Sequence, residues 1–229
     1  MEHYRYVKME SVTISVPVLP LISIVLGVSM LFWVIWPLLS FQVMYGGKTN
    51  TVSPIAEDFV PKVQANELDA DYTKASSWFP KNSHIKTVTP VDTYFLTIPK
   101  LHMQNAVVKI GTDDLAKNII HYGGTGLPGK YGNAVLFGHS ILPHFYDPKN
   151  YLSIFSLIPT LKKGDDIFVR FDGVDYRYEV IEGVVTSPAD VSGLEQRYDD
   201  SYLTLVTCFP PGLFVKRYWL TAKLRPFGE

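Results

Sequence analysis

Cysteine is nearly absent from this chain of 229 residues, which contains a single one, Cys208. One cysteine excludes an internal disulfide. The scattered histidines and the lone cysteine offer no ligand pair at the spacing of zinc sites, and no acidic stretch follows the Asp-rich pattern of a calcium loop. We therefore expect no metal site and no cofactor.

An excess of charge of either sign is missing as well. The formal net charge is -1 at pH 7, and no run of Lys and Arg occurs anywhere in the chain. Binding to nucleic acid needs at least a local basic patch, so the sequence excludes a nucleic-acid partner. The hydrophobic content of 47%, by contrast, is enough to build a core.

Charged residues are also absent from residues 11–47. Because about 20 mostly apolar residues suffice to cross a bilayer, this stretch predicts a transmembrane helix rather than a buried core helix. A cleaved signal peptide would carry small residues after its apolar region, whereas bulky side chains occupy residues 31–36. We expect an uncleaved signal anchor over residues 11–45.

The flanks of this stretch predict its orientation. Arg5 and Lys8 precede it, while only Lys48 follows closely before the first acidic residues. The positive-inside rule then places residues 1–10 in the cytoplasm. We expect a single-pass protein of the cell membrane whose remaining part is extracellular.

Residues 46–91 predict a linker or N-terminal appendage, because apolar positions there are too sparse for a core helix. Trp78 and Phe79 are the exception. Two large aromatic side chains in a polar segment are expected to pack onto the domain that follows. A mobile cover over a binding groove is the alternative interpretation of the same pair.

From residue 92 onwards the pattern changes to short strands separated by turn signals, which is typical of a mainly β domain closed, or nearly closed, into a barrel. One helix is expected over residues 112–120, where helix formers follow a Thr-Asp-Asp start. The predicted strands cover residues 93–98, 105–109, 134–137, 167–171, 176–185, 202–208 and 216–222.

The last two predicted strands carry the residues of greatest chemical interest. Cys208 ends the first, Arg217 opens the second, and a Pro-Pro-Gly break lies between them. A thiol needs activation at neutral pH, because the thiolate is the nucleophile and the usual pKa is about 8.5. Arg217 is either the charged residue of an edge strand or a donor aimed at a developing oxyanion.

A histidine is the natural partner for such a thiol, and two of the six remain after inspection of their surroundings. His139 follows an apolar strand that ends in glycine, so its imidazole would emerge at a strand end. His121 follows the predicted helix and precedes a glycine pair. From the residues alone, a structural role is at least as plausible as a catalytic one for each.

Taken together, these segments resemble a known family. In order, the chain contains Leu-Thr-Ile-Pro at 96–99, Leu-Pro-Gly at 127–129, Gly-His at 138–139, Lys-Gly-Asp at 163–165, and Thr-Leu-Val-Thr-Cys at 204–208 followed by Arg217. At this spacing they resemble the sortases, membrane-anchored cysteine transpeptidases of the bacterial cell surface. Residues 120–129 resemble class C, D and E members more than class A. One departure is Ser140, which stands where many sortases have an arginine.

The resemblance implies a closed eight-stranded sortase-type β-barrel with one or two short helices, over residues 92–229. Cys208 resembles the nucleophile that forms an acyl thioester, and His139 the general acid and base. Arg217 would hold the oxyanion or the substrate backbone.

The resemblance also implies a substrate groove. Thr207 and Gly138 match positions that contact the substrate, and residues 186–201 match the loop that shapes recognition of the sorting signal.

The implied substrates are surface proteins that carry a sorting signal of the Leu-Pro-x-Thr-Gly kind (LPxTG), cleaved between Thr and Gly. The implied acceptor is an amine of a cell-wall precursor or a pilin lysine. Two alternatives stay open at this point: an exported cysteine peptidase that only hydrolyses, and an inactive membrane-tethered β-barrel that binds peptides.

Overall fold

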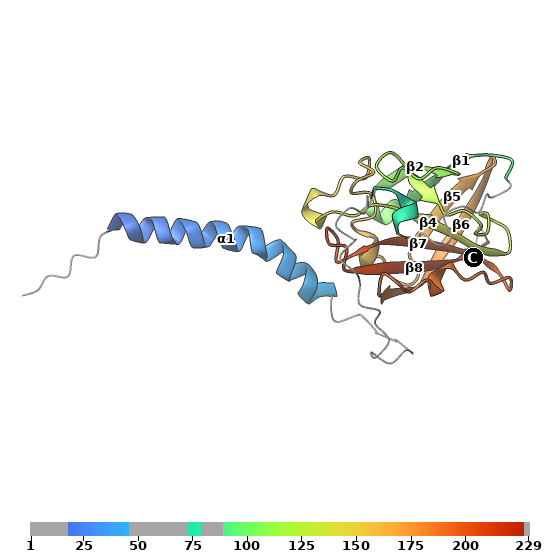
Figure 1. The fold of residues 1–229 in the computed structure, drawn as a ribbon. Coiled ribbons are helices and arrows are strands. Elements are labelled where there is room, and N and C mark those ends of the chain that lie inside the picture. The colour runs from blue at the N-terminus through green and yellow to red at the C-terminus, as the bar shows by residue number, and fades with distance from the viewer. Residues whose placement is uncertain (1–17, 46–72, 79–88, 227–229) are drawn as a thin grey trace, which may run out of the picture. The chain divides into compact units, whose positions relative to one another are not determined.

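A computed structural model describes residues 18–45, 73–78 and 89–226 (Figure 1). The expectations for residues 1–10, for most of the linker and for Phe79 fall outside these described residues. The chain divides into two units, residues 1–40 and residues 41–229, and each is described by itself.

Helix α1, Val18–Tyr45, contains 28 residues and carries no acidic residue in its first turn and no basic residue in its last. Apolar side chains such as Leu26 and Trp33 are exposed along it. Among the described residues, no helix meets the combined length and hydropathy required of a membrane span. The anchor expected over residues 11–45 therefore stays a prediction.

The second unit contains a closed β-barrel with the strand order β1-β2-β3-β4-β7-β8-β6-β5 (Figure 1), which confirms the expected eight-stranded closed barrel. Most neighbours are antiparallel, but β2 pairs with β3, and β4 with β7, in parallel. The strands are β1 Thr93–Ile98, β2 Met103–Ile110, β3 Ile119–His121, β4 Gly132–Phe137, β5 Asp166–Phe171, β6 Val174–Thr186, β7 Ser201–Phe209 and β8 Lys216–Arg225.

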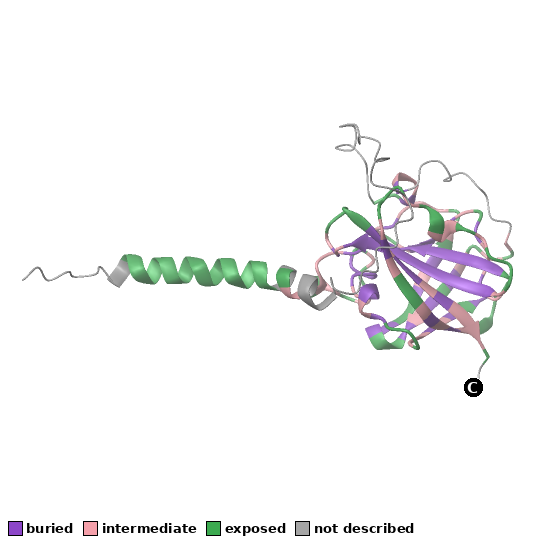
Figure 2. Cartoon of the chain, turned by 90° about the horizontal axis from the view of Figure 1, so that it is seen from below, coloured by how far each residue is buried: buried purple, intermediate pink, exposed green. Residues whose placement is uncertain are grey.

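Strand β7 is buried at every position (Figure 2). Because side chains alternate along a strand, one set faces the barrel interior and the other faces outward. Leu203 and Leu205 join the main interior core, whereas Val206 and Cys208 join a second apolar cluster. A central strand covered on both faces reads as a nearly continuous apolar run, as β7 does.

The second apolar cluster includes residues that precede the barrel in the sequence. Ala75 and Trp78 pack in it with Leu115, which confirms that Trp78 packs onto the following domain. Lys74 forms an isolated antiparallel bridge with Asp114. The short segment of residues 73–78 is therefore attached to the barrel by backbone pairing as well as by apolar contact.

The helix expected over residues 112–120 is wrong. The Asp113 carboxylate accepts a hydrogen bond from the Ser76 amide (2.6 Å), and the Asp113 carbonyl accepts one from Ala75. Ile119 already belongs to β3, which pairs with β2. Tertiary contacts thus outweigh helix propensity here. Within residues 73–78 and 89–226, helical residues occur only as single 3₁₀ turns.

His121 is buried in the barrel wall, with a structural set of partners. The Tyr94 hydroxyl lies 2.8 Å from its Nδ1, and the Thr125 hydroxyl lies 3.3 Å from its Nε2. Burial lowers the pKa of His121 from 6.5 to about 4. The neutral imidazole is therefore the form that the fold accommodates.

A lowered pKa in the folded state makes stability depend on pH. The unfolded chain binds a proton at His121 below about pH 6.5, whereas the folded chain resists it until about pH 4, so stability falls as pH drops through this window. We expect a loss of about 3 kcal/mol for this one group. Denaturant unfolding at several pH values should show it, and His121→Gln should lose less stability than the wild type across the window. An identical pH dependence in the two proteins would contradict the assignment.

Candidate active site

The pairing of β7 with β8 sets Cys208 directly opposite Arg217. The two residues flank the break at residues 210–215, so they lie at the same end of adjacent antiparallel strands, as expected from the sequence. Arg217 Nη1 lies 3.7 Å from Cys208 Sγ and donates toward it. A guanidinium therefore stands beside the thiol, where it favours the thiolate.

His139 reaches the same end of the barrel through the other neighbour of β7. Phe137, the last residue of β4, pairs with Val206 in parallel register. Because the strands run in the same direction, His139, two residues beyond Phe137, is level along the sheet with Cys208, two residues beyond Val206. The structure therefore brings Cys208, His139 and Arg217 together at the same end of three adjacent strands. Each of these three side chains has little exposed surface.

Gly138 is the hinge between β4 and His139. A Cβ at this position would lie 2.5 Å from the ring of Phe155, so only glycine lets the chain pass so close to that ring. Gly138 therefore lies against the Phe155 ring. The expected contact of Gly138 with substrate stays a prediction.

Thr207 faces the opposite side of β7 from Cys208, because side chains alternate along a strand. It is fully buried, and its hydroxyl donates a 2.9 Å hydrogen bond to the Gly138 carbonyl. The observed role is to hold the end of β4 against β7. The groove-lining role that the resemblance implies stays a prediction.

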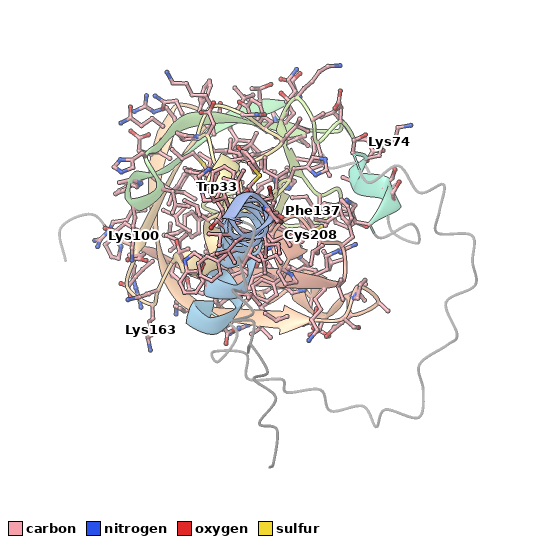
Figure 3. All side chains as sticks on the ribbon, turned by 90° about the vertical axis from the view of Figure 1, so that its left-hand side faces the viewer. Trp33, Lys74, Lys100, Phe137, Lys163 and Cys208 are labelled. Atoms are coloured by element: carbon pink, nitrogen blue, oxygen red, sulfur yellow. The ribbon has the colours of Figure 1, made fainter. Side chains whose placement is uncertain are left out.

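Trp78 lies over the site. Its ring centroid is 4.9 Å from the Arg217 guanidinium carbon and 6.2 Å from the His139 ring, which it meets at a steep angle. It also belongs to the apolar cluster of Cys208 and Phe137, both labelled in Figure 3. The sequence showed that Trp78 packs onto the barrel, but no local signal showed that it does so over these three side chains.

Burial dominates the electrostatics of the thiol. Cys208 is 1% exposed. Burial raises its pKa to about 11, against the opposite effect of Arg217. At neutral pH the thiol is therefore protonated in this covered arrangement, and the thiolate requires water or a polar substrate group to reach the site.

Arg217 is a buried cation that no carboxylate neutralises in the described part of the chain. Its Nη1 donates to the backbone carbonyls of Phe214 and Lys216, each at 3.3 Å, while its Nε has no hydrogen-bond partner among the described residues. The Trp78 ring supplies a cation–π contact that offsets part of the desolvation cost. Free donor capacity on a buried guanidinium is suited to an oxyanion or a substrate carbonyl.

Hydrogen bonds attach the connection between β6 and β7 to the neighbouring strands next to the site. Asn133 Nδ2 donates to the Gly193 carbonyl at 3.0 Å, and Trp219 Nε1 donates to the Thr186 hydroxyl at 2.9 Å. A cavity of about 200 Å³ lies between this connection and the outer faces of the neighbouring strands, with Trp219 in its wall. Trp219 also packs in the cluster of Cys208, so the cavity adjoins the site.

Within residues 18–45, 73–78 and 89–226, no group of three His, Cys, Asp or Glu side chains is arranged to hold a metal ion.

Comparison with known proteins agrees with the chemistry of this site. A family model of the sortase domain matches residues 96–225. Sortase D of Bacillus subtilis (strain 168) is 29% identical over 189 residues, which cover 78% of this chain and 89% of the relative.

Among solved structures, the Sortase D5 transpeptidase of Clostridium perfringens is similar, with 29% identity, coverage of 66% of this chain and 88% of that one, and a TM-score of 0.51. The sortase C1 of Streptococcus suis has 29% identity, coverage of 59% and 73%, and a TM-score of 0.52. With the family model matching more than half of the chain around a buried thiol, imidazole and guanidinium, this chain belongs to the sortase family of cysteine transpeptidases.

Proposed function

We propose that this sortase cleaves a sorting signal of the Leu-Pro-x-Thr-Gly kind between Thr and Gly and transfers the acyl group to an amine. The observation that carries the proposal is the pairing of Cys208 with Arg217, beside the parallel β4, with His139 two residues beyond the end of that strand. A nucleophile, an acid and base, and an oxyanion donor come from three adjacent strands, as acyl transfer requires.

The first half-reaction consumes the peptide bond. His139 takes the thiol proton of Cys208 as Sγ attacks the threonine carbonyl carbon, and the carbonyl oxygen becomes an oxyanion that accepts a hydrogen bond from Arg217. When the C–N bond breaks, His139 gives a proton to the departing glycine amine. The products are an acyl thioester on Cys208 and a free amine.

The second half-reaction reverses these roles. His139 takes a proton from the incoming amine, whose nitrogen attacks the thioester carbon and expels the Cys208 thiolate. We propose an amine of a cell-wall precursor or a pilin lysine as acceptor. Gly138 and Thr207, beside the catalytic residues, are proposed to contribute to the substrate groove through the backbone at the ends of β4 and β7.

The cell-surface location of these substrates fits a tethered enzyme. We propose that residues 11–45 form a single-pass anchor with the N-terminus inside the cell, because the stretch is uncharged and the basic residues precede it. A chain anchored in this way carries its barrel outside, where surface proteins are displayed.

The acyl-enzyme is directly testable. Incubation of the full chain with a panel of Leu-Pro-x-Thr-Gly peptides, without amine, should add the mass of the acyl fragment to Cys208. Addition of triglycine or a lysine-containing peptide should then discharge the adduct into a new amide. Cys208→Ala should form no adduct. An adduct of the same mass on Cys208→Ala, or discharge to water that added amine does not alter, would contradict acyl transfer through this residue.

The position of Trp78 predicts that the thiol is shielded. In Trp78→Ala, water reaches Cys208, its pKa falls from about 11, and each unit of that fall gives about tenfold more thiolate at a fixed pH below the pKa. The rate of iodoacetamide alkylation at pH 8 should therefore rise by tenfold or more. Trp33→Ala, which removes an exposed tryptophan of α1, is the matched control and should leave the rate unchanged. Equal rates for Trp78→Ala and the wild type would show that Trp78 does not shield the thiol.

The proposed topology has its own test. A reporter fused after Glu229 should be active outside the cell, because the anchor leaves the barrel there. A reporter fused at the N-terminus should be active in the cytoplasm. The opposite pattern would contradict the proposed orientation.

A further inference from the structure

The parallel ladder between β4 and β7 stops just short of the catalytic residues. Its last register pair is Phe137 with Val206. Beyond that pair the Gly138 amide still donates to the Val206 carbonyl at 3.1 Å, and the Thr207 hydroxyl donates to the Gly138 carbonyl at 2.9 Å. Side-chain hydroxyls thus begin to replace backbone pairing where β4 ends.

Ser140 makes the next connection and reaches the residue of the nucleophile itself. Its hydroxyl donates a 3.1 Å hydrogen bond to the backbone carbonyl of Cys208. Ser140 is 4% exposed and Cys208 is 1% exposed, so water has little access to compete for this bond. The residue that directly follows His139 in the chain is therefore tied to Cys208.

The same segment is attached on its other side to residues 155–156. The Phe155 amide donates to the His139 carbonyl, and the Ile141 amide donates to the Ser156 hydroxyl, each at 2.9 Å. These two bonds fix the segment to the body of the unit. Of these three bonds, only the Ser140 bond reaches the nucleophile strand, and it does so on the far side of His139 from the bonds that Gly138 makes to β7.

We propose that Ser140 is a positioning residue: its hydroxyl, bonded to the Cys208 carbonyl, keeps the His139 imidazole at a constant place relative to the thiol in both half-reactions. This inference rests on the proposed function, because it assigns His139 and Cys208 to proton and acyl transfer. Ser140 does not touch the reacting atoms. It acts through the backbone of the residues on either side of the proton-transfer path.

The loss expected on removing the hydroxyl is one of rate rather than of substrate binding. In Ser140→Ala the segment is still held by its bonds to residues 155–156 and by the bonds of Gly138 to β7, but the link from the residue after His139 to the Cys208 carbonyl is lost. A misplacement of about 1 Å in a catalytic group can cost up to about a hundredfold in rate, and we expect kcat to fall about tenfold. KM should stay within about twofold, since binding contacts are unchanged.

The experiment compares three variants of the full chain with the wild type, on a Leu-Pro-x-Thr-Gly peptide that the wild type transfers to triglycine. Ser156→Ala is the matched control, because it removes the other buried serine hydroxyl that holds this segment but not the link to Cys208. It should keep kcat within about twofold of the wild type. Ser140→Thr keeps a hydroxyl and should recover most of the rate lost in Ser140→Ala. Thermal unfolding by circular dichroism checks that each variant is folded at the assay temperature.

A folded Ser140→Ala protein with wild-type kcat would overturn the proposal. Equal losses of kcat in Ser140→Ala and Ser156→Ala would also overturn it, since they would show general loosening of the segment. Failure of the proposed function would look different: the wild type itself would transfer no peptide through Cys208.

Discussion

Strand β7 depends on having a partner on each side, and the catalytic site depends on β7. Its parallel pairing with β4 and its antiparallel pairing with β8 satisfy the backbone groups of a strand that no water reaches. The same two pairings bring His139 and Arg217 to the end where Cys208 stands. A one-residue slip in either register would move one of these side chains to the other face of the sheet, so the fold of the barrel and the assembly of the site depend on the same strand pairing.

Two opposing effects act on the pKa of the thiol at this end of the barrel. Burial favours the neutral thiol, Arg217 favours the thiolate, and burial has the larger effect on the pKa of Cys208. The Trp78 ring stabilises the buried guanidinium by a cation–π contact and packs in the same apolar cluster as Cys208. We expect the thiolate to form more readily wherever water or a polar substrate group reaches Cys208.

The strands other than β3, the juxtaposition of Cys208 with Arg217 and the family resemblance could be predicted from the sequence, because alternation, turn residues and short motifs are local signals. Strand β3 was missed, because the sequence predicted a helix over most of its residues. The sequence also indicates that Thr207 and Cys208 face opposite sides of β7, because side chains alternate along a strand. The place of Trp78 and the loss of the helix at residues 112–120 depend on the pairing of Lys74 with Asp114. A contact between such distant residues leaves no local pattern in a single sequence.

We propose that Cys208 carries the acyl group between the two half-reactions. The time course of amine release after rapid mixing of enzyme and peptide tests this most directly. With a Leu-Pro-x-Thr-Gly peptide and no added acceptor, we expect a burst of the released fragment, which begins with glycine, equal in amount to the enzyme. A slow phase of release should follow. Added triglycine should accelerate only the slow phase. A single phase without a burst, whose rate rises in proportion to triglycine, would indicate direct attack by the amine and contradict a covalent intermediate on Cys208.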